Sequence, residues 1–221
     1  MTYNIDDIYK SLLDCINFEA MDEYGFNEDT VEDFFDTEKV FENWSLSCGA
    51  TKAVFIPRAD EAQYVIKIPF DRDCDGEFEY AWYSRSKMSG WDYCKAEMEM
   101  YEEAAMVGLR DFFAETALLT EVDGWPVYIS ERCDFGRCKE VTDKSREQAE
   151  RLIKAENIYT LTLAFMENII TEYSYHEIFE LVKFIDEHNI NDLRDANWGF
   201  IREYDYRPVI TDYSGYNEDC W

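Results

Sequence analysis

Hydrophobic residues in the first 43 positions recur every three to four residues, which is the period of an α-helix. There are two such stripes, and the second begins just after Thr30 and Asp33, which have the spacing of a helix-capping pair. The positions between the apolar ones are mostly acidic. We therefore expect two amphipathic helices with solvated acidic faces. The apolar positions are Ile5, Ile8, Leu12, Leu13 and Ile16 in the first stripe and Val31, Phe34, Phe35 and Phe41 in the second.

From Trp44 onwards, short apolar runs separated by turn residues replace the helical period, which predicts an antiparallel meander of strands. A long helical pattern follows and ends at Gly108. Asp123 and Gly124 then form a hairpin-turn sequence between two further strands. The expected elements are strands 44–47, 53–56 and 64–69, a polar loop 71–90, a helix 92–107, and strands 116–120 and 126–130.

Helical patterns dominate the remainder of the chain. Ser174 and Glu177 have the spacing of a capping box at the start of the last of these helices. A polar segment, 189–197, cannot continue that helix, and two short strand patterns come after it. These patterns together predict an α+β fold. The expected elements are helices 145–157, 159–171 and 175–187 and strands 198–202 and 208–211.

The composition is that of a globular chain. Of the 221 residues, 47% are hydrophobic and 17% aromatic, with only 9 Gly and 4 Pro, which excludes collagen-like, low-complexity and disordered classes. The formal net charge is −28, and thirteen acidic residues lie between positions 6 and 42 against Lys10 and Lys39. A field of this sign repels phosphate backbones and anionic membranes, so we expect no direct nucleic-acid or membrane binding.

No stretch of the sequence has the length and apolarity of a membrane span, and the first residues resemble no signal peptide. The seven cysteines are an odd number and are widely scattered. Both observations predict a cytoplasmic protein whose cysteines are reduced.

The polar segment after the last helix carries the first candidate for chemistry. It reads Asp192-Leu-Arg-Asp-Ala-Asn197, which keeps the Asp, Leu and Asn of the kinase catalytic loop H-R-D-L-x-x-x-N in register. Fifteen residues beyond Asn197, after a predicted strand pair, the sequence Asp212-Tyr-Ser-Gly stands where a kinase has its metal-binding Asp-Phe-Gly. On these paired motifs, residues 44–215 resemble the protein-kinase-like family, in particular small kinase-like proteins of bacteria and phages.

The resemblance extends upstream. Tyr64-Val-Ile-Lys67 is similar to the V-A-I-K motif of the third strand, and Glu97 lies on the helix that should bear the partner of that lysine. Glu97 is preferred over Glu99 because an apolar pair follows Glu97 at three and four positions. The two carboxylates lie about 200° apart around a helix, so only one can point at Lys67.

The glycine-rich loop of kinases is only partly present. Alignment on Val54 puts Ser47, Gly49 and Lys52 at its three glycine positions, so the middle glycine alone is kept. The resemblance makes Gly49, Lys52, Val54, Lys67 and Glu131 the expected nucleotide-binding residues.

The remaining roles follow from the charge of the ligand. Phosphoryl transfer requires Mg²⁺ held by carboxylate and carboxamide oxygens, which the resemblance assigns to Asp212 and Asn197. Asp192 would orient and deprotonate the attacking hydroxyl, and Arg194 would face the γ-phosphate. Lys67 and Glu97 complete the expected catalytic set. The implied cofactors are ATP and Mg²⁺.

Several features depart from the kinase pattern. Ile190-Asn191 replaces the His-Arg before the catalytic Asp, the glycine after Asp212 comes one position late, and the sequence ends nine residues beyond Asp212. We therefore expect a truncated helical C-lobe without a peptide-docking platform. The expected domains are an acidic helical extension (1–43), an N-lobe of antiparallel strands with one key helix (44–131) and the truncated C-lobe (132–221).

Two functions are compatible with these patterns. The first is a Mg-ATP-dependent phosphotransferase acting on a hydroxyl acceptor. The alternative is a non-catalytic pseudokinase or acidic decoy that binds and inhibits a basic, nucleic-acid-binding protein, as in conflict between phage and host. The net charge and the missing docking platform favour the alternative, and the retention of all six functional residues favours the enzyme.

Overall fold

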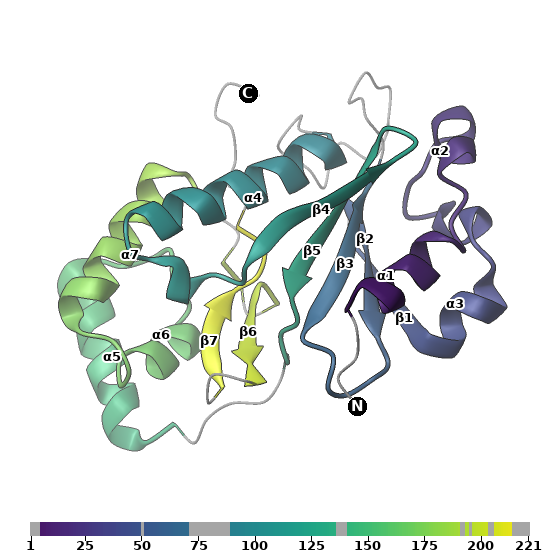
Figure 1. Cartoon of the computed structure of the whole chain (residues 1–221). Coiled ribbons are helices and arrows are strands. Elements are labelled where there is room, and N and C mark those ends of the chain that lie inside the picture. Colours follow the sequence, from purple (N-terminus) through teal and green to yellow (C-terminus); the bar gives the residue numbers. More distant parts are fainter. Residues whose placement is uncertain are drawn as a thin grey trace. The chain divides into compact units, whose positions relative to one another are not determined.

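The computed structural model describes residues 5–49, 51–70, 89–135, 141–190, 193–194, 196–202 and 206–213. These residues form an α+β structure with a five-stranded antiparallel sheet, a two-stranded antiparallel hairpin and several helices (Figure 1). They divide into two compact units. Unit 1 contains the described residues up to Lys95 and Thr116–Arg132, and unit 2 contains Ala96–Glu115 and the described residues from Cys133 onwards.

Unit 1 holds the five-stranded sheet, whose strand order is β1-β2-β3-β5-β4 with every neighbouring pair antiparallel. Asp123 and Gly124 have φ values of 51° and 80°, so they form the predicted tight turn between the last two strands. The elements are α1 (Ile5–Leu13), α2 (Phe18–Tyr24), the 3₁₀-helix η1 (Val31–Phe34), α3 (Thr37–Asn43), β1 (Trp44–Cys48), β2 (Lys52–Pro57), β3 (Tyr64–Pro69), the start of α4 (Gly90–Met106), β4 (Thr116–Val122) and β5 (Trp125–Glu131).

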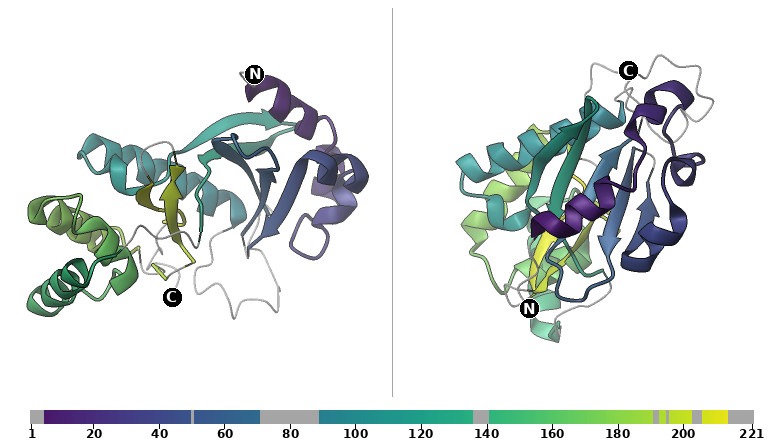
Figure 2. Two further views of the ribbon diagram at one scale, coloured as in Figure 1. Left: turned by 90° about the horizontal axis from the view of Figure 1, so that it is seen from below. Right: turned by 45° about the vertical axis from the view of Figure 1, so that its right-hand side comes forward.

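One face of the sheet is apolar and is covered by the N-terminal helices. Successive side chains of a strand point to opposite faces, so Phe55 and Ile66 share a face that excludes Val54 and Lys67. Phe55 and Ile66 belong to a buried cluster that includes Leu12 of α1 and Val40 of α3. Figure 2 shows these helices beside the sheet in both views. The N-terminal segment therefore completes the core of unit 1.

The N-terminal segment departs from the two helices that its sequence predicts. The second predicted helix is instead η1 followed by α3, and α2 is an additional helix. Thr30 was expected to cap the second helix, but its side chain makes no cap hydrogen bond and its hydroxyl donates to the Gly25 carbonyl. Asp36 caps α3 by accepting from the Lys39 N–H, and this late cap is why the helix starts only at Thr37.

The start of α4 packs closely against the ends of β2 and β3. A Cβ atom added to Gly90 would lie under 3.0 Å from the carbonyl oxygens of Thr51 and Phe70, so only glycine permits this approach. The Ser89 hydroxyl accepts a hydrogen bond from the Asp92 N–H and so fixes the first turn. Both contacts hold the first turns of α4 beside the residues that begin β2.

Unit 2 is a helical layer packed on the two-stranded hairpin. Side chains from the second half of α4, from α5, α6 and α7 and from the hairpin share one buried cluster. The predicted capping box of Ser174 and Glu177 is present at the start of α7. Thr162 caps α6 by accepting from the Phe165 N–H, so this helix is shorter than predicted. The remaining elements are η2 (Arg110–Phe112), α5 (Asp143–Glu156), α6 (Leu163–Ile169), α7 (Tyr175–Glu187), β6 (Trp198–Ile201) and β7 (Arg207–Ile210).

The two units differ in part from the domains that the sequence predicts. Residues 96–115 belong to unit 2, although the expected N-lobe, 44–131, includes them, and the extension 1–43 shares unit 1 with the sheet. Within the described residues, no helix is long and apolar enough to cross a membrane. The predicted loop 71–90 lies outside the described residues except for its last two positions.

Substitution of Gly90 by Ala should destabilise the protein by about 2–3 kcal/mol, because the new methyl group would overlap two backbone carbonyls that cannot move aside. Urea unfolding followed by circular dichroism measures the loss. Gly49→Ala is the matched control, since a Cβ there meets nothing within 4 Å. Equal stability of the two variants would contradict the close packing of α4.

The thiol of Cys48 tests whether the N-terminal segment lies against the sheet. Burial, and then the negative charges of Glu28 and Glu32, raise the pKa of Cys48 from 9.0 to about 11. The alkylation rate by iodoacetamide should therefore rise about tenfold per pH unit up to pH 10 in the folded protein. Peptide mass spectrometry measures this rate, and the urea-unfolded chain is the control. A plateau near pH 9 in the folded protein would contradict this packing.

Candidate functional site

The face of the sheet opposite the apolar cluster carries Lys67 near its centre. Lys67 of β3 stands directly between Val54 of β2 and Tyr128 of β5, and the row continues to Ser47 of β1 and Leu118 of β4. Residues paired in this way point to the same face of a sheet. Only 5% of Lys67 is exposed, although it is charged. This face therefore holds a buried cation at the position that the V-A-I-K resemblance predicts.

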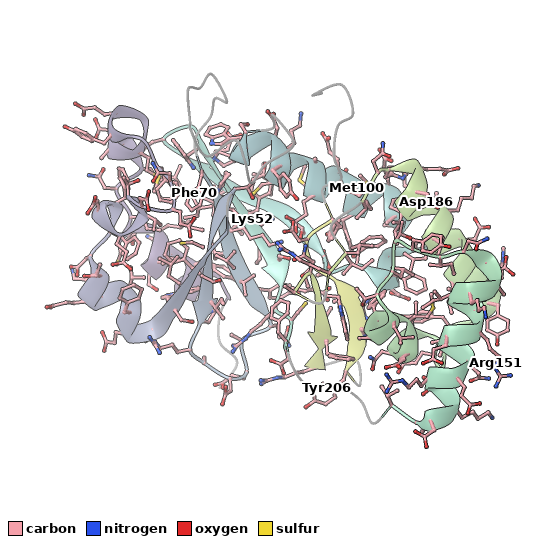
Figure 3. The ribbon with its side chains drawn as sticks, turned by 180° about the vertical axis from the view of Figure 1, so that it is seen from behind. Lys52, Phe70, Met100, Arg151, Asp186 and Tyr206 are labelled. Carbon is pink, nitrogen blue, oxygen red and sulfur yellow. The ribbon has the colours of Figure 1, made fainter. Side chains whose placement is uncertain are left out.

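A second lysine lies on the same face. Lys52 is two positions from Val54 along β2, so its side chain points the same way as that of Lys67. Lys52 is 7% exposed, and its Nζ lies 5.1 Å from the centre of the Tyr93 ring, in the first turns of α4. An ammonium group above an aromatic face is attracted by the ring, which offsets part of the cost of its burial. Figure 3 labels Lys52.

Two buried ammonium groups on one sheet face are an unusual arrangement. Removing a lysine charge from water costs several kcal/mol unless other groups compensate, and lysine is among the residues least often buried. On the opposite face of the same sheet, these strands bury apolar side chains such as Phe55 and Ile66. Interactions within the protein offset part of this cost for both lysines, and the positive charge of the lysine face has the sign that attracts an anionic ligand.

The turn between β1 and β2 begins with the exposed Gly49. Its Gly49 N–H donates to the Lys52 carbonyl at 3.1 Å, and the space beside the Gly49 α-carbon is open. Glycine is therefore not required here by packing within the described residues. Val54 is half-buried beside Lys67, which gives this face an apolar patch next to the cation.

Glu131 lies at the end of β5 with a different orientation. It pairs with Tyr64, and the alternation along β3 puts that pair on the face opposite Lys67. The side chain of Glu131 thus does not join the lysine face, and a contact with a ligand on that face would have to come from its backbone.

Glu97 is the carboxylate that sequence reasoning paired with Lys67. It is fully buried on α4, whereas Glu99 is exposed. This contrast agrees with the choice of Glu97 as the inward-facing acid. Glu97 belongs to unit 2 and Lys67 to unit 1, so their pairing stays a prediction.

In unit 2, the β6–β7 hairpin brings Asn197 and Asp212 to one end. Trp198 and Ile210 form the last pair of the ladder, and the Thr211 N–H donates to the Asn197 carbonyl at 2.9 Å. Asn197 therefore directly precedes β6. Asp212 directly follows Thr211, the residue whose N–H bonds to Asn197. Asn197 is 6% exposed and Asp212 is half-buried.

The segment before Asn197 is described in part. Leu193 is buried and Arg194 is exposed, and the Arg194 carbonyl accepts from the Asn197 N–H at 2.9 Å. Asp192, the predicted catalytic base, lies outside the described residues, as does Gly215 of the second motif. The structure thus places the backbones of Asn197 and Asp212 at one end of the hairpin and links the backbone of Arg194 to that of Asn197.

Tyr213 anchors this end of the hairpin and was assigned no role from the sequence. It is fully buried, its hydroxyl donates to the Ala114 carbonyl at 2.5 Å, and its ring meets Phe113 edge-on at 5.0 Å. The Ala114 N–H in turn donates to the Ile210 carbonyl. Because Tyr213 follows Asp212 directly, these contacts fix the backbone of Asp212. In the sequence, the sign of this anchoring role is that an aromatic residue directly follows Asp212.

The chain that leads into the predicted catalytic loop is anchored by His188. One ring nitrogen lies 2.8 Å from the Phe184 carbonyl and the other 2.7 Å from a carboxylate oxygen of Glu103 on α4. Asn189 then reverses the chain with a φ of 52°, and Ile190 is buried. These contacts hold the chain up to Ile190, directly before the predicted catalytic loop, within unit 2.

Asn197 and Asp212 fit the ligand chemistry of Mg²⁺, which prefers oxygen donors and takes only one or two protein carboxylates, with phosphates and water completing its shell. Within the part of the chain that the structure describes, no group of three or more His, Cys, Asp or Glu side chains is placed to hold a metal.

Comparison of the chain with protein-family models, with curated proteins and with solved structures finds no match.

Replacement of Tyr213 by Phe should lower the free energy of unfolding by about 1–2 kcal/mol, because it leaves the buried Ala114 carbonyl without its hydroxyl donor. Urea unfolding measures the loss. Tyr175→Phe is the control, since Tyr175 is 53% exposed. If both variants matched the wild type, Tyr213 would not be the anchor of Asp212.

Proposed function

We propose that the protein is a Mg-ATP-binding, kinase-like phosphotransferase that acts on a hydroxyl acceptor. The observation that carries the proposal is the lysine face of the five-stranded sheet, where Lys52 and Lys67 are both buried on the side opposite the apolar core. Ammonium groups are the donors that bind linked phosphates, and these two lie on one face of the same sheet.

The order of elements along the chain supports the same proposal. A strand hairpin is followed by a strand with an interior lysine, a helix with a buried glutamate, two strands, a group of helices and a hairpin preceded by Asn197. Lys67, Glu97 and Asn197 stand in this order at the places that the kinase-like resemblance assigns to them. The placement of Asn197 and Asp212 at one end of that hairpin adds a second, independent support.

In this proposal each residue has one task. Lys67 contacts the phosphates and Glu97 holds Lys67, while Asn197 and Asp212 hold Mg²⁺. Bound Mg²⁺ would neutralise the charge that develops on the phosphates during transfer. Asp192 accepts the proton of the attacking hydroxyl. Arg194, exposed in the structure, is available to the transferred phosphoryl group.

The net charge of −28 sets a condition on binding. A ligand as negative as ATP is repelled at long range by such a protein, and a divalent cation reduces the charge of the ligand that approaches. ATP binding should therefore depend strongly on Mg²⁺.

The proposal predicts that ATP and Mg²⁺ together, and neither alone, raise Tm. At a ligand concentration about 100 times Kd the stabilisation is about 2.7 kcal/mol, which corresponds to roughly 5–10 °C for a chain of this size. Lys67→Met and Asp212→Asn should abolish the shift. Lys183→Met and Asp186→Asn, at exposed positions of α7, are the matched controls and should keep it. Differential scanning fluorimetry measures all of these, and calorimetric titration at 25 °C replaces it for any variant of low Tm.

Catalysis is separated from binding by Asp192→Asn. This variant should retain the shift with Mg-ATP and lose ADP production. Binding without ADP production in the wild type would identify a non-catalytic nucleotide-binding protein.

The absence of any shift in the wild type would overturn the nucleotide proposal and leave the acidic decoy as the alternative. The structure offers one observation in favour of that alternative: the N-terminal helices bury their apolar side chains on the sheet, so their acidic ones face outwards. The exposed acids with described side chains are Asp14, Glu19, Glu23, Glu28, Asp29, Glu32, Asp33, Asp36, Glu38 and Glu42.

A further inference from the structure

The lysine face of the sheet also carries a pair of buried hydroxyl groups. Thr116 of β4 and Ser130 of β5 stand directly opposite each other, and their hydroxyl oxygens lie 3.0 Å apart. Thr116 is 1% exposed and Ser130 is 2% exposed. Ser130 is two positions from Tyr128, which pairs with Lys67, so the alternation along β5 puts both hydroxyls on the lysine face.

The two hydroxyls have more hydrogen-bonding capacity than the protein uses. Together they carry two protons, and the bond between them takes one. Neither hydroxyl makes a second hydrogen bond within the residues that the structure describes. Buried hydroxyl protons are nearly always bonded to an acceptor, because an unpaired one costs free energy. The pair therefore has one proton to donate to an acceptor that the described chain does not supply.

We propose that Ser130 donates this proton to a ring nitrogen of the purine base of a bound nucleotide, and that Thr116 holds the Ser130 hydroxyl in place by donating to it. The inference rests on the proposed function and adds the group that reads the base. Ser130 is then a specificity-determining residue. Thr116 is a positioning residue, whose effect on the ligand passes through Ser130.

The place of the pair relative to Lys67 favours a nucleotide. Ser130 pairs with Val65, two positions before Lys67, so Ser130 and Lys67 are diagonal neighbours about 7–8 Å apart. Lys52 lies on the other side of Lys67 along the strands, opposite Pro69. The lysine face is thus positively charged at one end and neutral but polar at the other. A nucleotide has the same division, since a ribose separates its phosphates from its base.

The neighbouring side chains suit a flat base. Val65 beside Ser130 and Val54 beside Lys67 are apolar and point to the same face of the sheet. A purine ring gains free energy from burial against such side chains, whereas a phosphate does not. In these surroundings a ligand without the acceptor leaves the Ser130 proton unpaired, and such a site discriminates strongly against it.

The direction of the hydrogen bond selects the atoms to test. The group that the pair offers is a donor, so its partner must be an acceptor. The exocyclic amino group of adenine is a donor, whereas N1, N3 and N7 of the ring are acceptors. The ligands for the test are therefore ATP and its 1-deaza, 3-deaza and 7-deaza analogues, in each of which C–H replaces one ring nitrogen.

Calorimetric titration at 25 °C in Mg²⁺ tests Ser130. The wild type should bind at least one deaza analogue about fivefold more weakly than ATP, because the Ser130 proton loses its acceptor. Ser130→Ala should bind ATP and that analogue with affinities within about twofold of each other, both near the wild-type affinity for the analogue. Thr120→Val, on the same strand as Thr116, is the control and should bind all four ligands like the wild type, since the Thr120 hydroxyl donates to the Glu121 carbonyl.

Thr116 is tested with two substitutions. Thr116→Val removes the hydroxyl and should weaken ATP binding about threefold, without changing the affinity for the analogue that lacks the acceptor. Thr116→Ser keeps the hydroxyl and should restore ATP affinity. In the Ser130→Ala background, Thr116→Val should have no further effect on ATP affinity. An equal loss for ATP and for the analogue would overturn the positioning role, since it would not depend on the ligand atom that Ser130 contacts.

Removal of both hydroxyls separates recognition from folding. Without ligand, the Tm of the Thr116→Val, Ser130→Ala double variant should equal or exceed that of the wild type, because replacing both partners of a buried bond by apolar groups costs little. Its affinity for ATP should still fall about fivefold. A lower Tm with unchanged discrimination among the four ligands would assign the pair to folding alone and overturn the inference.

The outcomes distinguish this inference from the proposed function. If the wild type binds Mg-ATP and binds all three deaza analogues equally tightly, the inference fails and the proposed function stands. The same holds if Ser130→Ala discriminates among the four ligands as the wild type does. If the wild type binds none of them in Mg²⁺, the proposed function fails and the inference fails with it.

Discussion

The alternation of side chains along the five-stranded sheet is the constraint on which unit 1 depends. With a period of two residues, β2 and β3 present Phe55 and Ile66 to one face and Lys67 to the other. A shift of register by one residue would put both lysines into the apolar cluster, where an uncompensated charge costs several kcal/mol. The N-terminal helices cover the apolar face and so hold this register. Because Phe55 and Ile66 are fixed on the covered face, the lysines point to the opposite one.

How well the sequence predicted each element depended on whether neighbouring residues alone determine it. Strands β1 to β5, the helix α4 and the capping box of Ser174 follow from local pattern, and the structure confirms them to within a few residues. The N-terminal segment was predicted less well, because Thr30 has the spacing of a cap yet bonds backwards to Gly25. There, competing local hydrogen bonds and the shape of the sheet surface decide where helices begin, and periodicity does not reveal either. The same holds for α6, whose start is set by the Thr162 cap.

The candidate site shows the same division. Lys67, Asn197 and Asp212 could be selected as candidates because they lie in short motifs whose spacing is kept along the chain. The burial of Lys52 and the roles of Tyr93 and Tyr213 could not, since each depends on a partner on another element. Tyr213 bonds to Ala114, which is 99 positions away, and Tyr93 meets Lys52 only because Gly90 lets α4 approach the sheet. Residues that position others leave little trace in a single sequence.

The arrangement of unit 1 also explains how a chain of net charge −28 can keep a cationic face. The acidic side chains of the N-terminal segment that the structure describes are exposed, whereas its apolar side chains pack on the face of the sheet opposite the lysines. The acidic surface therefore lies on the other side of the sheet from Lys52 and Lys67, and its charge repels anions that approach from its own side. Each side of the sheet thus has its own electrostatic character, and the two need not act on the same partner.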